Sequence, residues 1–301
     1  MFGFKSNLTI KVQETHNPYY KYAKPYQVTE DDGWTVYFIG SDGPDYIYGD
    51  AFSDWIYGNG GNDGLVGGGG RDFMYGGEGR DTFIGGPGAD EMFGEGGDDF
   101  FFGELDGNII NGGDGFDTVS YFGMDKGVSV FLSLGFAQET DAPWAFDLIT
   151  FVEEVIGTSH DDVIAGSAVL SGDRLIGGAG NDVLSGNAGT DVLNGGYGGD
   201  ELTGGADSDT FVFNLNDSNG PLSSFDTIKD FDFDDDVMEF QVYDPNATAW
   251  SATQGSVEGQ SGTWVTVTEV DENLAPTKTL YEVFLEGTAP ATVTDEDVLF
   301  V

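Results

Sequence analysis

The chain has 301 residues and carries 54 acidic against 10 basic side chains, which gives a net charge of −44. This excess of negative charge disfavours nucleic acid and anionic membranes as partners, because both carry charge of the same sign. No segment approaches the roughly 20 consecutive apolar residues of a membrane-spanning helix, so we expect no membrane insertion. The sequence has no cysteine, which excludes disulfide bonds.

Residues 1–39 form a first segment with a different composition. Alternating residues at 9–12 and 35–38 predict two short strands. One interpretation is an N-terminal cap that covers the open end of the following structure. The other is a basic, aromatic arm that docks on an acidic neighbouring subunit, and the sequence leaves both open. The segment lacks the apolar run of a cleavable signal peptide. Its basic and aromatic residues include Lys5, Lys11, Lys21, Lys24, Tyr19, Tyr20, Tyr22 and Tyr26.

Residues 40–120 repeat with a period of nine in the pattern Gly-Gly-x-Gly-x-Asp-x-apolar-x. A fixed period of this kind is typical of a solenoid. The position two residues after the aspartate holds an apolar side chain, such as Ile47 or Leu65. The aspartate register reads Asp45, Asp54, Asp63, Asp72, Asp81, Asp90, Asp99, Asn108 and Asp117.

Each repeat is predicted to form one short strand and one glycine-rich turn, so that two repeats make one coil. Odd and even repeats then stack into two parallel sheets, which is an all-β fold of the parallel β-roll type. Aspartates of repeats two apart lie about one strand spacing, ~4.8 Å, from each other. Carboxylates this close repel each other unless a cation lies between them, and oxygen-only sites suit Ca²⁺. Because each repeat buries only one large apolar side chain, we expect the coils to fold only with multiple calcium ions bound.

Residues 121–156 interrupt the period and are predicted to be a β connector. Within them, Val128, Val130, Leu132 and Leu134 alternate with other residues as in a half-buried strand. A second array with the nonapeptide pattern covers residues 157–212, and two extra residues before its second aspartate predict a bulge. His160 is interpreted as a turn residue. The aspartate register of this array reads Asp162, Asp173, Asp182, Asp191, Asp200 and Asp209.

Residues 213–301 are predicted to form a β-rich C-terminal cap. Segments 265–268 and 281–285 alternate as strands around a turn. Residues 297–301 place one acid before four apolar residues, which predicts a terminal strand, a secretion signal, or one segment that serves as both.

The two arrays resemble those of RTX (hemolysin-type) calcium-binding proteins. The connector is similar as well, with Tyr121, a strand at 127–132 and a re-entry at 154–157. Segments 225–231 and 236–240 resemble the region that closes an RTX block, and residues 297–301 look like the uncleaved signal of the type I secretion route. The resemblance implies a Gram-negative bacterial protein that stays unfolded in low cytosolic calcium. It would leave through the type I secretion apparatus and fold outside the cell or at its surface.

No catalytic motif accompanies the arrays, and we expect no enzymatic activity. The sequence has no His-Glu-x-x-His, no Gly-x-Ser-x-Gly and no phosphate-binding Gly-x-x-x-x-Gly-Lys-Ser/Thr. Carboxylate pairs are frequent, but their periodic placement favours metal binding over a glycosidase-like pair.

Outward positions beside the even strands of the first array carry large aromatic side chains. A contiguous exposed aromatic patch on a protein marks an interface, although the connector or the C-terminal strands would equally explain it by covering it. The candidate interface residues are Trp55, Tyr57, Phe73, Tyr75 and Phe93.

These observations favour a secreted, non-enzymatic RTX protein that self-associates into a calcium-dependent surface layer, filament or matrix. The first alternative is a calcium-dependent adhesin that binds glycans or a cell surface through the aromatic residues. The second is a polysaccharide-acting enzyme or an accessory module of one.

Overall fold

The computed structural model describes residues 37–140, 142–168, 172–214, 225–241, 248–257, 259–270, 276–288 and 293–301, together with two earlier strands, β1 (Thr9–Val12) and β2 (Tyr26–Thr29). The fold is all-β, as predicted, with one 3₁₀ helix among the described residues, η1 (Leu132–Leu134). No helix in this part of the chain is long and apolar enough to cross a membrane.

The chain divides into two compact units, each with its own strands. The first unit contains Met1–Ser120, Gly135–Gln138 and Ala142–Val152. The second contains Tyr121–Leu134, Glu139–Asp141 and Glu153–Val301. The connector predicted at residues 121–156 therefore contributes segments to both units.

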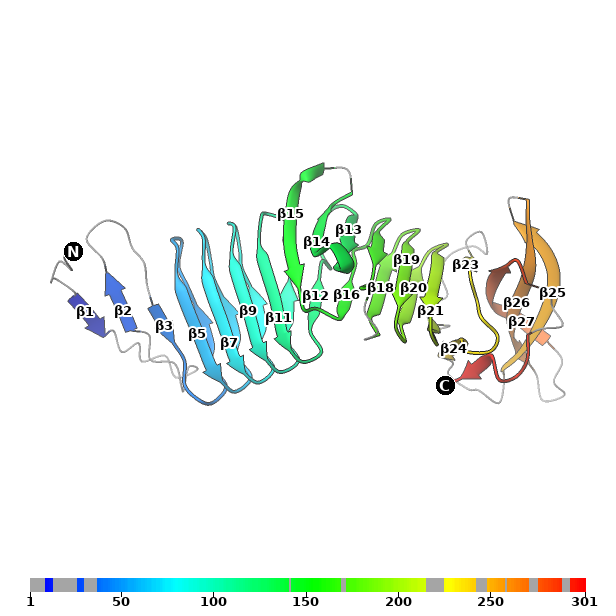
Figure 1. Cartoon of the computed structure of the whole chain (residues 1–301), viewed down its shortest axis with the longest axis horizontal. Coiled ribbons are helices and arrows are strands. Elements are labelled where there is room, and N and C mark those ends of the chain that lie inside the picture. Colours follow the sequence, from blue (N-terminus) through cyan, green and yellow to red (C-terminus); the bar gives the residue numbers. More distant parts are fainter. Residues whose placement is uncertain are drawn as a thin grey trace. The chain divides into compact units, whose positions relative to one another are not determined.

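In the first unit each nonapeptide forms one short strand, and the strands of alternate repeats pair in parallel (Figure 1). Partners lie 18 residues apart, such as Ile56 with Met74 and Leu65 with Phe83. One sheet contains β3 (Tyr37–Ile39), β5 (Trp55–Gly60), β7 (Phe73–Glu78), β9 (Glu91–Gly96), β11 (Ile109–Asp114) and the connector strand β15 (Ala142–Thr150).

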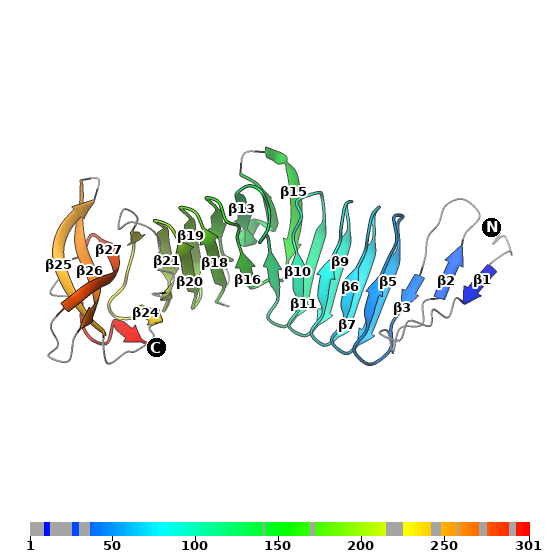
Figure 2. The same cartoon turned by 180° about the vertical axis from the view of Figure 1, so that it is seen from behind.

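The odd repeats of the first unit form the second sheet, part of which is labelled in the reverse view (Figure 2). It contains β4 (Tyr46–Tyr48), β6 (Gly64–Val66), β8 (Thr82–Ile84), β10 (Phe100–Phe102) and β12 (Thr118–Ser120). Strands β1 and β2 pair antiparallel, and β2 pairs with β3. The cap and the docking arm predicted for residues 1–39 depend on lysine and tyrosine side chains within residues 1–36. These side chains lie outside the described part of the structure.

The core of the first unit is thin, because each strand of its two sheets contributes one central apolar side chain. Each strand turns its central apolar residue inward, and Ile56, Met74, Phe83 and Phe101 are completely buried. Phe83 and Phe101 stack with their ring centroids 4.6 Å apart. A core this thin buries one large side chain per repeat, so the turns must contribute to stability.

The second unit repeats this arrangement and ends in an antiparallel meander. One of its sheets contains β13 (Val128–Phe131), β17 (Val163–Ala165), β19 (Val183–Ala188), β21 (Glu201–Ala206), β23 (Asp226–Ile228), β27 (Pro276–Glu286), β26 (Gln260–Val270) and β25 (Thr248–Val257). The other contains β16 (Glu154–Ile156), β18 (Arg174–Ala179), β20 (Val192–Tyr197), β22 (Thr210–Asn214), β24 (Val237–Gln241) and β28 (Val298–Phe300). Strand β14 (Phe136–Glu139) lies in the connector.

The connector differs from the prediction at one point. The alternating pattern predicts a strand through Leu134, but β13 ends at Phe131, and η1 follows with Leu134 70% exposed. Strand β13 pairs with β17, which ends at Ala165, opposite Phe131. Strand β17 therefore does not extend beside Leu132 to Leu134, and the alternation of these residues alone does not sustain a strand.

Candidate calcium sites

The aspartates of both arrays form hydrogen-bonded ladders along the turns. The backbone N–H of Asp45 donates to Oδ1 of Asp63 at 2.8 Å, and that of Asp54 donates to Oδ1 of Asp72 at 2.8 Å. The same bond recurs down each ladder, and we call each aspartate position a rung. The first unit contains the ladders Asp45, Asp63, Asp81, Asp99, Asp117 and Asp54, Asp72, Asp90, Asn108. The second contains Asp162, Asp182, Asp200 and Asp173, Asp191, Asp209.

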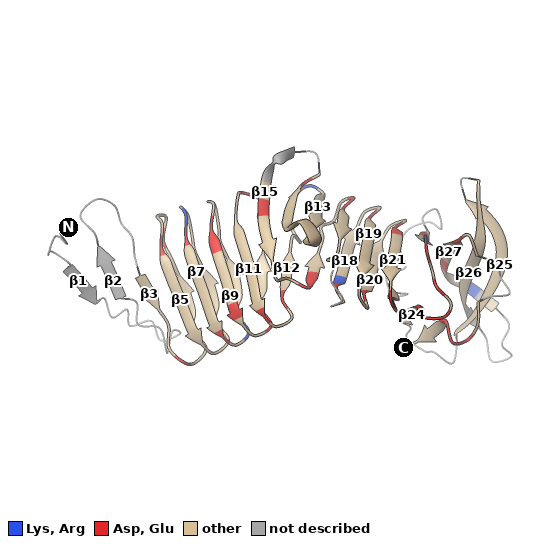
Figure 3. Ribbon diagram, viewed as in Figure 1, with Lys and Arg blue, Asp and Glu red and all other residues tan. Residues whose placement is uncertain are grey.

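Every side chain of these ladders is buried, although the turns that carry them are at the surface. Asp54, Asp72 and Asp81 have no exposed area, and the most exposed member, Asp63, reaches 3%. Acidic residues gather at the ends of the strands in both arrays (Figure 3). The two registers hold nine and six predicted metal-binding residues. The structure places all fifteen of them in the four ladders.

Most ladder rungs face a glycine at which carbonyl and carboxylate oxygens converge. A Cβ atom built on Gly166 would lie 2.6 Å from both Oδ2 of Asp173 and the carbonyl oxygen of Gly186 on the next coil. No side chain fits there, which explains why glycine opens each repeat. We call this arrangement an oxygen cage. It recurs at Gly40, Gly49, Gly58, Gly67, Gly76, Gly94, Gly157, Gly177 and Gly186.

The chemistry of these cages fits calcium. Oδ2 is buried and has no hydrogen-bond partner at Asp63, Asp72, Asp81, Asp90, Asp99, Asp182, Asp191, Asp200 and Asp209. A buried carboxylate oxygen without a partner is costly unless a cation meets it. Burial raises the pKa of Asp90 and of Asp99 to about 7, and neighbouring ladder carboxylates add to the effect. Oxygen donors alone are what Ca²⁺ prefers, and the Asp Oδ2 atoms with the glycine carbonyls would hold it.

The first rung of each ladder differs from the interior rungs. Oδ2 of Asp45 accepts the N–H of Ser41 at 2.6 Å, and Oδ2 of Asp162 accepts that of Thr158 at 2.6 Å. Asp54 and Asp173 are bonded in the same way by Asp50 and Ser167. In interior turns the residue at the corresponding position has a left-handed backbone, including Asn59, Glu95 and Asn187 with φ of 75°, 72° and 75°. The local N–H therefore closes the carboxylate at the first rung of each ladder, whereas Oδ2 stays open at Asp63, Asp99 and Asp191, which follow the three left-handed residues.

Three aspartates that the period does not identify extend the ladders. Asp147 accepts the N–H of Asn108, Asp226 that of Asp200, and Asp236 that of Asp209. In each case the second carboxylate oxygen also accepts a hydrogen bond, from Leu105, Tyr281 and Asp232 respectively. These residues end the ladders. The signal that would have found them is the sequence Asp-x-apolar at the start of β23, at the start of β24 and within β15.

No group of three or more His, Asp or Glu side chains that could share a metal ion occurs in the described part of the chain. This agrees with cages that combine one carboxylate with backbone carbonyls. His160 is exposed, and its N–H donates to Oγ1 of Thr158 at 3.0 Å, which is the geometry of a turn residue.

The predicted interface residues lie side by side on the outer face of the even sheet. Trp55 stacks on Phe73 with centroids 4.4 Å apart and planes inclined by 14°. Tyr75 stacks between Tyr57 and Phe93 at 5.1 and 5.0 Å. We call these five residues the aromatic stack. All five are partly exposed, and each ring uses at least one face to cover a neighbour.

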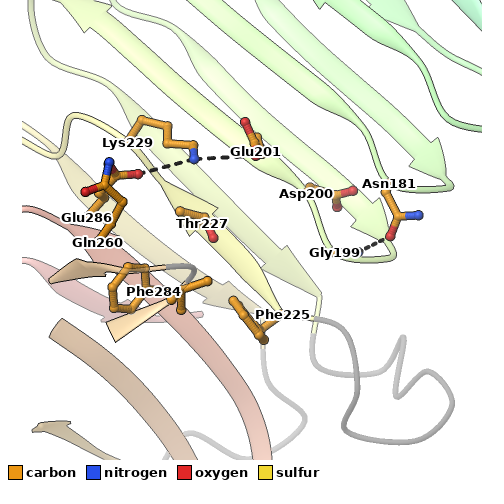
Figure 4. Close-up of a pocket in the computed structure, with 11 residues that line it drawn as sticks. Asn181, Gly199, Asp200, Glu201, Phe225, Thr227, Lys229, Gln260, Phe284 and Glu286 are labelled. Atoms are coloured by element: carbon orange, nitrogen blue, oxygen red, sulfur yellow. Dashed lines mark hydrogen bonds and ion pairs between the residues drawn. The ribbon is translucent and has the colours of Figure 1, made fainter. Parts of the chain in front are cut away.

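A pocket of about 300 Å³ lies beside the last rungs of the second unit. Figure 4 shows Lys229 between Glu201 and Glu286, with Nζ 3.4 and 3.2 Å from their carboxylates. These ion pairs join β21 and β27 through the residue that follows β23, and they neutralise the single lysine of the pocket. Phe225 and Phe284 line its other side.

Comparison with known proteins identifies the arrays. The family model of the RTX calcium-binding nonapeptide repeat matches at residues 39–74, 75–110, 171–200 and 186–217. The chain is 30% identical to the AlgE6R3 subunit of the mannuronan C5-epimerase from Azotobacter vinelandii, over 47% of this chain and 78% of that one, with a TM-score of 0.36. The AlgE6R2 subunit is 31% identical over 47% and 89%, with a TM-score of 0.35.

The extracellular lipase LipA from Serratia marcescens is 18% identical over 90% of this chain and 41% of the lipase, with a TM-score of 0.30. The chain thus corresponds to less than half of the lipase. This protein belongs to the family with RTX calcium-binding nonapeptide repeats, and the matched residues contain every ladder rung except Asp117 and Asp162.

Proposed function

We propose that this RTX protein is secreted and forms a calcium-dependent structural assembly outside the cell, without enzymatic activity. The aromatic stack is the observation that carries the proposal, because it is a row of partly exposed rings on the outside of a regular sheet. Calcium contributes twice. It would hold the coils in register, and it would lower the repulsion between copies that each carry a charge of −44.

The geometry of the stack favours a second copy of the chain over a glycan. Sugars bind aromatic side chains through the ring face, but the faces of Tyr75 are covered by Tyr57 and Phe93. At Tyr75 the ring edge remains accessible, and a row with its inner ring covered in this way suits packing against another ordered protein surface. The ladder carboxylates bond backbone N–H groups, and for this reason we do not propose a polysaccharide-acting enzyme.

Sedimentation and electron microscopy of the full chain in calcium test the proposal. We expect association that increases with protein concentration and that weakens about tenfold, or by about 1.4 kcal/mol, in Tyr75→Ser. The control is Tyr48→Ser, because Tyr48 is 55% exposed on the other sheet of the same unit. A protein that folds in calcium and stays monomeric at all concentrations would contradict the assembly role.

A glycan-binding adhesin is the second candidate, favoured by the end of the aromatic stack. The partner of Phe93 on β11 is Asn111 rather than another aromatic residue, which places an amide beside a terminal ring. Neutral glycan binding by a monomer, lost in Phe93→Ala, would support this candidate in place of assembly.

A further inference from the structure

Asn108 is the one position of the first register without a carboxylate. It is completely buried and follows Asp90 in its ladder. Its Oδ1 accepts the backbone N–H of Asp90 at 2.8 Å, as Oδ1 of Asp72 accepts that of Asp54. Asn108 therefore keeps the hydrogen bond of the ladder.

This bond also fixes the orientation of the Asn108 amide, because the donor N–H of Asp90 must meet an oxygen. The Nδ2 group then occupies the place where the aspartates have Oδ2. It is buried and has no hydrogen-bond partner. An amide NH₂ group is a donor with no lone pair to offer, so it cannot be a calcium ligand.

The next rung is already satisfied by hydrogen bonds. Asp147 accepts the N–H of Asn108 through Oδ1 at 3.0 Å and the N–H of Leu105 through Oδ2 at 3.2 Å. It lies in β15, which pairs with β11 through Ile109 and Leu148. Both oxygens of this carboxylate thus bind backbone groups of the array.

The turn before Asn108 is altered in a consistent way. In the preceding coil the N–H groups of Gly68 and Gly70 donate to backbone carbonyls. The equivalent groups of Gly86 and Gly88 donate to the carboxylates of Glu104 and Asp106, at 2.7 and 2.8 Å. The three atoms nearest to a Cβ on Gly85 all belong to Asp90, as the three nearest to Gly195 and Gly204 belong to Asp200 and Asp209 at the end of the second array.

We propose that Asn108 is a calcium-free rung, at which the first array is joined to the connector strand by hydrogen bonds instead of a bound ion. The regular ladder of calcium cages ends before this rung, and Asp147 replaces metal coordination with two N–H bonds. The proposal concerns the calcium sites alone and is independent of the assembly proposed above.

The number of calcium ions bound per chain tests this inference, measured by equilibrium dialysis with metal analysis at saturating calcium. Asn108→Asp restores Oδ2 beside Asp147, and we expect it to bind one additional ion. Asp147→Asn should leave the number unchanged, because this residue is not a ligand. The matched control Asp72→Asn, in a regular cage of the same ladder, should lose one ion.

Circular dichroism in calcium establishes that each variant is folded. An unchanged ion count in folded Asn108→Asp would overturn the inference, as would the loss of one ion in Asp147→Asn. If Asn108→Asp does not fold, the comparison of Asp147→Asn with Asp72→Asn still decides, because equal losses would place calcium at the Asn108 rung.

Discussion

At the scale of single residues, the turns are arranged to leave a carboxylate oxygen open. Interior turns adopt a left-handed backbone after their first glycine, a conformation that costs most residues roughly 1–2 kcal/mol. Glycine avoids this cost at Gly77 and Gly113, whereas Glu95 has φ of 72° without that freedom. Glu95 thus has a strained backbone beside an oxygen cage. Strained residues of this kind cluster at functional sites.

The buried carboxylates predict how calcium binding depends on pH. Burial raises the pKa of Asp63 and Asp72 to about 6 and of Asp182 and Asp209 to about 7. In the metal-free fold these raised pKa values favour the protonated carboxyl groups. The protonated groups therefore contribute fully to the stability of that fold below the unfolded pKa of 3.8. That contribution is lost as pH rises through 6 to 7.

Calcium must displace these protons, and its apparent affinity should therefore increase from about pH 5 to about pH 8, with most of the change near the raised pKa values. Calcium titrations followed by circular dichroism at several pH values measure the midpoint. A midpoint that does not change over this range would contradict the assignment of these carboxylates as ligands.

At the scale of elements, the second array is closed by strands that do not belong to it. Strand β23 pairs with β21 on one side and with β27 of the meander on the other. Asp226 at the start of β23 receives the Tyr281 hydroxyl of β27 at 2.6 Å. Burial raises the pKa of Asp226, and this hydrogen bond opposes the rise. The meander thus supplies a hydroxyl to the last carboxylate of this ladder.

The Tyr281→Phe variant tests this closure. It removes the donor and leaves a buried carboxylate oxygen without it, so we expect the free energy of unfolding to fall by about 2 kcal/mol at saturating calcium. Urea denaturation measures the change, with Tyr46→Phe as a control because Tyr46 is 63% exposed. Equal effects of the two substitutions would show that the hydroxyl does not hold the end of the ladder.

The predictable elements are those that repeat. The nine-residue period predicts the strands, both sheets and the ladder positions, because each repeat places its apolar residue in the core and its aspartate in a turn. Asp147 and Asp226 follow their ladder partners by 39 and 26 residues instead of 18, so no period identifies them. The end of β13 at Phe131 depends on the length of its partner strand, which the alternation of Leu132 and Leu134 does not report.

At the scale of the whole molecule, the negative charge makes folding depend on calcium. The chain has 54 acidic side chains, and the buried carboxylates of the ladders lie one coil apart. Their mutual repulsion increases as the coils form, while the thin core supplies one apolar side chain per strand. A cation in the oxygen cages removes the repulsion and satisfies the open Oδ2 atoms at the same time.

Removal of calcium should therefore unfold the arrays. We expect the β spectrum in circular dichroism to be lost in chelator and restored by added calcium. Magnesium at the same ionic strength is the control. It requires a smaller, near-octahedral site and retains its water, so cages that rely on backbone carbonyls should not accept it. Salt alone should also fail, because it screens exposed charges far better than buried ones. A β spectrum that survives chelation would mean that apolar packing and the aromatic stack hold the coils without metal, and the role given to the ladders would then be wrong.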